Sequence, residues 1–135
     1  MSQTDRETVT AGQPWSPKYT FVPAVRAGQF LFLSGTTATD DAGQLVGRGD
    51  IAEQTRQIFR KFERLLGAVG ATCDDIVETT DYFVTTENYR ATAAVRREFF
   101  KRHFPASTGV QVAGLLREGA LIEIKAVALI PEAAR

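Results

Sequence analysis

Cysteine and histidine are almost missing from this chain of 135 residues, which holds one of each, Cys73 and His103. A single cysteine cannot form an intrachain disulfide, so we expect a reducing compartment and a cytoplasmic location. One cysteine and one histidine are also too few for a zinc site built from nitrogen and sulfur ligands. We interpret Cys73 as a thiol in a turn, and His103 as a cation in the last turn of a helix, where the helix dipole favours positive charge.

The chain also lacks an excess of charge of either sign. It has 16 Lys and Arg against 16 Asp and Glu, which gives a formal net charge of zero. This balance argues against a nucleic-acid-binding protein, because such proteins carry a basic surface. No run approaches the ~20 apolar residues that span a bilayer, and the N-terminus has no apolar run of signal-peptide length. We therefore predict no membrane association.

The length and the 44% hydrophobic content fit one domain with a real core. We divide the chain into a flexible N-terminal arm over 1–18 and an α+β domain over 19–135. The arm carries the single tryptophan, Trp15. Two interpretations of Trp15 stay open: it covers a pocket or partner, or it fixes the arm to the body of the domain.

Two helices are predicted. The first begins at Asp50, where Glu53 three residues later completes a capping box, and it ends at Gly70. Its apolar residues fall on one stripe at helical spacing: Ile51, Ile58, Phe59, Phe62, Leu65, Leu66 and Val69. The basic residues at 56, 60, 61 and 64 lie mainly off that stripe, which predicts a solvated face. The second helix is predicted from about Glu87 to His103, before Pro105, which cannot continue a helix.

Alternation and β-branched content predict strands over the remaining chain: 19–25, 30–34, 76–84, 109–115 and 121–130, with a short strand or loop at 44–46. This order predicts an α+β fold, one mixed sheet with both helices packed on one face. The other face keeps apolar side chains. We therefore expect an oligomer that buries them.

Polar residues at strand ends and within strands are the candidate site residues. Ser107 and Thr108 open a strand just after the helix stop, and Gly35 ends an apolar strand. Asp81 lies within a predicted strand, where a carboxylate needs either water or a partner. Two interpretations stay open: Asp81 lies on a solvated face of the sheet, or it is a polar group in a subunit interface. Glu123 in the last strand is the best candidate for a positioned carboxylate, with an exposed or cross-strand-paired residue as the alternative. The residues alone predict no reaction.

Four stretches, in this order and spacing, resemble the Rid family of reactive intermediate deaminases, the YjgF group once described as L-PSP endoribonucleases: FLFLSG at 30–35, DIAEQTRQIFRKFERLLGAVGAT at 50–72, FFKRHFPAST at 99–108, and VQVAGL…LIEIKAVAL at 110–129. The resemblance covers about Phe21 to Ile130. It implies a chorismate-mutase-like fold and a homotrimer with clefts between subunits. It also implies hydrolysis of enamines or imines to a keto acid and ammonia, without a metal or organic cofactor.

The resemblance also implies roles for single residues. Ser34 and Gly35 match the family's cleft-lining pair, and Glu123 matches the acidic residue that orders a water, which makes it the expected catalytic residue. Phe21 stands at a substrate-binding position where many members have Tyr. Ser107 stands where the best-known deaminases have an Arg that binds the substrate carboxylate.

Ser107 cannot replace a guanidinium, because the bidentate charged pair is lost. Another cation must therefore bind a carboxylate, with Arg117 or Arg26 as candidates, or the ligand is larger or less acidic. Gly109, where many members carry a bulkier residue, would enlarge the cleft, and Ser107, Thr108 and the Gly35 backbone would hold the ligand. Finding Arg117 inside the cleft of the trimer would count against the larger or less acidic ligand.

Two functions from different classes follow, and a third is disfavoured. The first is a Rid-like hydrolase of an enamine, an imine or a related conjugated amino compound, with a substrate that differs from that of Arg-containing members. The second is a non-catalytic trimer that binds a small molecule or regulates a partner. Ribonuclease activity, the old family description, is disfavoured by the neutral charge and by the absence of a basic stripe with interleaved aromatics.

Overall fold

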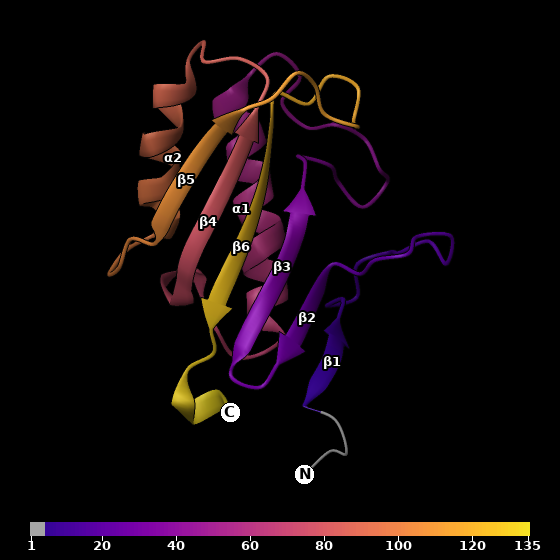
Figure 1. The fold of residues 1–135 in the computed structure, drawn as a ribbon, viewed down its shortest axis with the longest axis vertical. Coiled ribbons are helices and arrows are strands. Elements are labelled where there is room, and N and C mark those ends of the chain that lie inside the picture. The colour runs from indigo at the N-terminus through magenta and orange to yellow at the C-terminus, as the bar shows by residue number, and fades with distance from the viewer. Residues whose placement is uncertain (1–4) are drawn as a thin grey trace.

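Six strands form one mixed sheet in the order β1-β2-β3-β6-β4-β5 in the computed structural model, which describes residues 5–135 (Figure 1). The strands are β1 (Arg6–Val9), β2 (Ala24–Ala27), β3 (Phe30–Thr36), β4 (Ile76–Phe83), β5 (Ala106–Gln111) and β6 (Ile122–Leu129). The β4–β5 pair is parallel and the other neighbours are antiparallel. The predicted α+β class with a mixed sheet is confirmed.

Helix α1 (Ile51–Gly67) crosses behind the sheet in Figure 1. The Asp50 carboxylate accepts a hydrogen bond from the Glu53 N–H at 3.1 Å, so the predicted N-cap is confirmed. The predicted apolar stripe is buried against the sheet, with Phe59 and Phe62 fully enclosed. The helix ends at Gly67, and Gly70 follows in a final turn with a φ of 73°.

The predicted second helix was too long at both ends. Helix α2 covers Thr92–Phe99 and is preceded by the 3₁₀ turn η2 (Tyr89–Ala91), which follows Asn88 in a left-handed conformation. Helix α2 packs on α1, where the Phe99 and Phe59 rings stack with centroids 5.5 Å apart.

Asp74 explains where α2 stops. This carboxylate belongs to the short turn η1 (Cys73–Asp75) and accepts hydrogen bonds from the N–H groups of Lys101, Arg102 and His103, at 2.9, 2.8 and 3.2 Å. The chain beyond α2 is therefore held by a long-range partner and leaves the helical path. His103 lies outside the helix, so its predicted role at the helix dipole was wrong.

The N-terminal half of the sheet differs from the predicted ranges. Within the segment expected as a flexible arm, β1 pairs with β2 in antiparallel register. The strand predicted at 19–25 is displaced to β2, because Tyr19–Pro23 forms bends before it. At 44–46 the structure has one isolated bridge, between Thr39 and Leu45, and no strand. The domain boundary between residues 18 and 19 stays a prediction.

The two faces of the sheet differ in cover. Along β6, the side chains of 122, 124, 126 and 128 are buried on the helix side, and those of Glu123, Lys125 and Val127 point to the other side, as predicted. That open side exposes 47% of Phe32, which lies opposite Val127 on the neighbouring strand.

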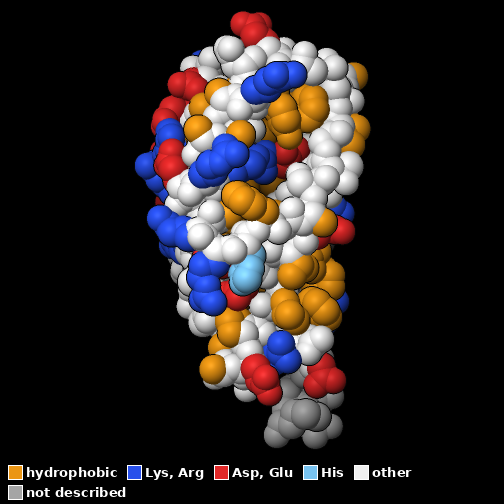
Figure 2. Space-filling view, turned by 90° about the vertical axis from the view of Figure 1, so that its left-hand side faces the viewer, with side chains coloured by type: hydrophobic (Ala, Val, Ile, Leu, Met, Phe, Trp, Pro, Cys, Tyr) orange, Lys and Arg blue, Asp and Glu red, His pale blue; other side chains and the backbone are white. Residues whose placement is uncertain are grey.

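Figure 2 shows the β5 and α2 side of the molecule, where Lys and Arg gather beside hydrophobic side chains. The apolar open face supports the oligomer prediction, which stays a prediction.

Candidate functional site

A cleft of about 370 Å³ opens beside the C-terminal end of β3. Four of the residues predicted from sequence line it: Phe21, Gly35, Arg117 and Glu123. The other lining residues come from the β1–β2 connection, the end of β3 and the loop after it, α1 and the β5–β6 loop: Gln13, Trp15, Tyr19, Thr36, Thr37, Thr39, Lys61, Leu116 and Glu118. Ser34 lines a smaller adjoining pocket, and its hydroxyl donates to the Val22 carbonyl at 2.6 Å.

Glu123 is the half-buried carboxylate of this cleft. Burial raises the pKa of Glu123 above its ordinary value. Its carboxylate has no hydrogen bond or ion pair within residues 5–135. It lies directly over Gly35, where a Cβ atom would be 2.6 Å from the Glu123 Oε2 atom. Gly35 therefore leaves the room that the carboxylate occupies.

Lys61 was wrongly assigned to a solvated face. Its side chain is partly buried, and its ammonium donates to Thr36 Oγ1, to the Thr37 carbonyl at 2.9 Å and to Thr39 Oγ1 at 2.9 Å. Burial, and next the positive charge of Arg117, lower the pKa of Lys61 to about 8. Lys61 therefore puts a positive charge at the cleft wall.

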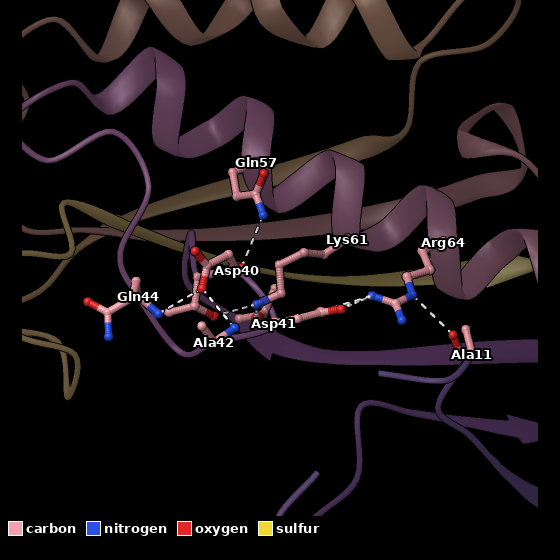
Figure 3. Close-up of polar contacts among 10 residues, drawn as sticks. Ala11, Asp40, Asp41, Ala42, Gln44, Gln57, Lys61 and Arg64 are labelled. Carbon is pink, nitrogen blue, oxygen red and sulfur yellow. Dashed lines mark hydrogen bonds and ion pairs between the residues drawn. The ribbon is translucent and has the colours of Figure 1, made fainter. Parts of the chain in front are cut away.

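A row of α1 side chains holds the loop that follows β3 (Figure 3). Gln57 donates to the Thr39 carbonyl at 3.1 Å, Lys61 binds the start of the loop, and Arg64 pairs with Asp41 at 2.9 Å. Gln57, Lys61 and Arg64 are spaced by four and three residues, so they lie on one side of the helix beside the apolar stripe. This spacing is the sequence signal that would have indicated a role for Lys61.

Arg117 reaches the cleft from the loop between β5 and β6. The buried Gln54 of α1 fixes this loop by donating to the Gly119 carbonyl at 3.2 Å and accepting from the Leu121 N–H at 2.8 Å. The exposed Arg117 guanidinium forms no salt bridge within residues 5–135. Glu118, beside it, is paired with Arg48 at 3.2 Å. Among the described residues, the cleft thus combines two cations, Lys61 and Arg117, with the carboxylate of Glu123, which has no partner there.

Ser107 and Thr108 do not line this cleft within one chain. Ser107 lies opposite Thr79, whose hydroxyl donates to the Ser107 Oγ atom at 3.2 Å, and Thr108 lies opposite Thr80 on the other face of the sheet. Both residues belong to the edge strand β5, which β6 and β4 separate from β3. Arg26 also lies elsewhere, because its guanidinium donates to the Ala134 carbonyl.

Gly109 does not enlarge the Glu123 cleft. A Cβ atom at Gly109 would lie 3.1 Å from the Phe83 ring and 3.3 Å from the Tyr89 hydroxyl. These aromatic side chains fill the space on the helix side of β5, where Gly109 pairs with Asp81. The expectation that Gly109 widens the cleft is therefore not met in this chain.

Asp81 lies neither on a wet face nor at an exposed interface. It is fully buried on the helix side, where its Oδ2 atom accepts hydrogen bonds from Arg96 and, at 2.6 Å, from the Tyr89 hydroxyl. Burial, and next the Asp81 carboxylate, raise the pKa of Tyr89 to about 12. The Asp81 Oδ1 atom has no partner among the described residues. This network ties β4 to η2 and α2, which indicates a structural role.

The structure of residues 5–135 bears on three further possibilities: a reactive thiol, a metal site and a membrane-spanning helix. The Cys73 thiol is buried, and burial raises its pKa to about 12, so it is a poor nucleophile. The described residues contain no group of three or more His, Cys, Asp or Glu side chains that could hold a metal ion. In the same range, no helix has both the length and the apolar content needed to cross a membrane.

A family model described as Endoribonuclease L-PSP matches residues 12–130, nearly the whole chain. The chain belongs to the Rid family. A Rid family protein from Yersinia pestis, YyfA, has a solved structure that superposes with a TM-score of 0.83 at 30% identity, covering 93% of this chain and 99% of that one. Both the predicted family and its fold are thus confirmed.

Two relatives carry names that state a reaction. The 3-aminoacrylate deaminase RutC of Acinetobacter baylyi is 33% identical over 112 residues, which are 83% of this chain and 88% of that protein. The human 2-iminobutanoate/2-iminopropanoate deaminase is 33% identical over 107 residues, 78% of this chain and 77% of that protein. Both substrates are small and contain a C–N bond and a carboxylate.

Proposed function

We propose that the Glu123 cleft hydrolyses an imine or enamine that carries a carboxylate. The observation that carries this proposal is a half-buried carboxylate that has no partner within the described part of the chain and faces a cleft with two cations, Lys61 and Arg117. The relatives named as deaminases support the same class of reaction. We propose Glu123 as the catalytic residue and Phe21, Gly35 and Arg117 as residues that contact the substrate.

The proposed chemistry needs proton transfer and positioning. The ionised Glu123 accepts a proton from water while the water oxygen attacks the carbon of the protonated imine, which forms a neutral carbinolamine. The protonated Glu123 then gives this proton to the nitrogen. The C–N bond breaks and releases ammonia, while the hydroxyl proton of the carbinolamine passes to Glu123 or to solvent and leaves the keto acid. A carboxyl group with a raised pKa suits both steps, because its protonated form is less costly to reach during turnover than that of an exposed carboxyl group. No metal or organic cofactor takes part in this scheme.

Arg117 is the proposed replacement for the arginine that is absent at Ser107. It lines the cleft and forms no salt bridge within residues 5–135, so its guanidinium is available for a carboxylate. Lys61 adds positive charge, but its hydrogen bonds to the loop after β3 hold it in place. This arrangement supports an acidic ligand and weakens the alternative of a less acidic one.

We propose that the active form is a homotrimer, in which a neighbouring copy covers the open sheet face. The exposed Phe32 and Val110 side chains on that face support this assembly. Ser107 and Thr108 on the edge strand β5 would then reach a cleft of a neighbouring copy, and the site would be composite. A solution mass near three times the 14.8 kDa of one chain is expected, and a monomeric mass would refute this assembly.

The proposed reaction is tested by generating 2-imino acids in situ with an amino-acid oxidase and following the suppression of semicarbazone formation. We expect the wild-type protein to remove the imines, and Arg117→Ala to lower kcat/KM by about 10- to 100-fold, the loss of a charge-assisted hydrogen-bonded pair. Arg97→Ala is the matched control, because Arg97 is exposed on α2, outside the cleft. Failure to remove any imino or enamine substrate would favour the non-catalytic binding protein.

A further inference from the structure

We infer that the rings of Trp15, Tyr19 and Phe21 form an aromatic wall that selects ligands with a planar aromatic group next to their carboxylate. These three rings all line the Glu123 cleft. The inference rests on the proposed function and narrows its substrate class, from any small imino or enamino acid to an aromatic one.

The aromatic wall is preassembled. The Trp15 ring meets the Tyr19 ring edge-on at 4.9 Å and the Phe21 ring at 5.2 Å between centroids, and Tyr19 and Phe21 lie 5.3 Å apart. The Trp15 Nε1 atom donates to the Phe21 carbonyl at 2.7 Å, which fixes the indole against the β1–β2 connection. These side chains therefore lose little conformational entropy when a ligand binds here.

The rings keep a free surface toward the cleft. Tyr19 is 50% exposed and Phe21 is 52% exposed, although each already contacts two other rings. Burying a ligand ring against such a surface is favourable both through the apolar area removed from water and through edge-to-face or offset contacts between rings.

The charges of the cleft decide which aromatic ligand fits. Aromatic clusters also bind cations, but the cations Lys61 and Arg117 line this cleft and would repel a positively charged ligand. Glu118, the other acid of the lining, is paired with Arg48. An anionic ligand satisfies both features, because its carboxylate faces Arg117 while its ring packs on the aromatic wall.

The aromatic wall is tested by ligand binding, with the fluorescence of the single tryptophan as the signal. We expect 3-phenylpropanoate to bind roughly 10- to 100-fold more tightly than propanoate, as burial of a phenyl ring predicts. The alcohol 3-phenylpropan-1-ol, which lacks the carboxylate, should bind as weakly as propanoate. In the Tyr19→Ala/Phe21→Ala variant, the preference for 3-phenylpropanoate should fall to less than about threefold. Phe104→Ala is the control, because Phe104 is a 70% exposed ring between α2 and β5.

The same variants are then compared in the imine-hydrolysis assay with imines derived from phenylalanine and alanine. A larger fall in kcat/KM for the imine derived from phenylalanine than for the imine derived from alanine, in Tyr19→Ala/Phe21→Ala, supports the inference. Equal binding of 3-phenylpropanoate and propanoate to the wild type overturns it, even if every imine is hydrolysed. Selective binding of 3-phenylpropanoate without hydrolysis of any imine overturns the proposed deaminase and leaves the aromatic wall as a ligand site.

Discussion

Asp81 and Glu123 are acidic residues on the neighbouring strands β4 and β6, and the sheet places them in opposite environments. Asp81 is fully buried on the helix side and is bound by Arg96 and Tyr89. Glu123 is half-buried on the other side, beside a cleft and without a partner within residues 5–135. A paired carboxylate stabilises the structure around it, while an unpartnered carboxylate at a cleft is available to a ligand.

The largest expected effect is on catalysis at Glu123. Glu123→Gln keeps the size of the side chain but removes its proton-accepting group, so kcat should fall by roughly 100- to 10,000-fold. Imine removal by wild type and variant gives this ratio, and the circular dichroism spectra should coincide. Glu87→Gln, a change of an exposed acid outside the cleft, is the control. Turnover within threefold of wild type in Glu123→Gln would assign the chemistry to another group.

The next effect is on stability at Asp81. Arg96→Met removes the charged partner and leaves the buried carboxylate uncompensated, which should lower the free energy of unfolding by about 3–5 kcal/mol. Urea denaturation measures this change. Arg97→Met, at the exposed neighbouring position on α2, should change it by less than about 0.5 kcal/mol. Equal stability of the two variants would mean that the Asp81 network does not hold α2 on the sheet.

The smallest expected effect is on the free energy of unfolding, because ionising the half-buried Glu123 carboxyl group destabilises the folded state. Its pKa is raised in the folded state, so between the ordinary value of 4.5 and that raised value the folded protein binds more protons than the unfolded chain. Stability due to this group therefore falls as pH rises through that window. Glu123→Gln should be more stable than wild type at pH 7.5 by less than about 1 kcal/mol, and the gain should vanish below pH 4.

Thermal or urea unfolding at the two pH values measures this difference. Glu87→Gln again serves as the control and should show no gain at either pH. A Glu123→Gln variant that is less stable than wild type at pH 7.5 would show that the carboxylate has a stabilising partner in the assembled protein.

Local sequence patterns predicted α1 well and α2 poorly. The start of α1 depends on Asp50, and its buried face on apolar residues repeated at helical spacing, so both follow from nearby residues. The end of α2 depends on Asp74, which lies 27 residues before Lys101 and captures the backbone there. Such a long-range partner leaves no signal near the helix end, and the predicted helix therefore ran on to His103.

The residues of the candidate site were likewise predicted only in part. Glu123, Gly35 and Phe21 were predicted from sequence and line one cleft. Lys61 was missed, because a lysine beside an apolar stripe is usually solvated, and only the loop after β3 supplies its acceptors. Ser107 and Thr108 were grouped with Glu123, although β5 places them at a distant edge of the sheet within one chain.

By itself, the sequence determined the α+β class and the alternation that turns Glu123 away from the helices, because both depend on local spacing of apolar and polar residues. The family followed from the resemblance of four stretches of the sequence to the Rid family. Tertiary structure alone decided which of the two acids is paired and which has no partner among the residues that the structure describes. That choice depends on partners far along the chain: Arg96 reaches Asp81 through the packing of α2. Around Glu123, the β5–β6 loop and the β1–β2 connection instead form the wall of a cleft that holds Arg117 and three aromatic rings.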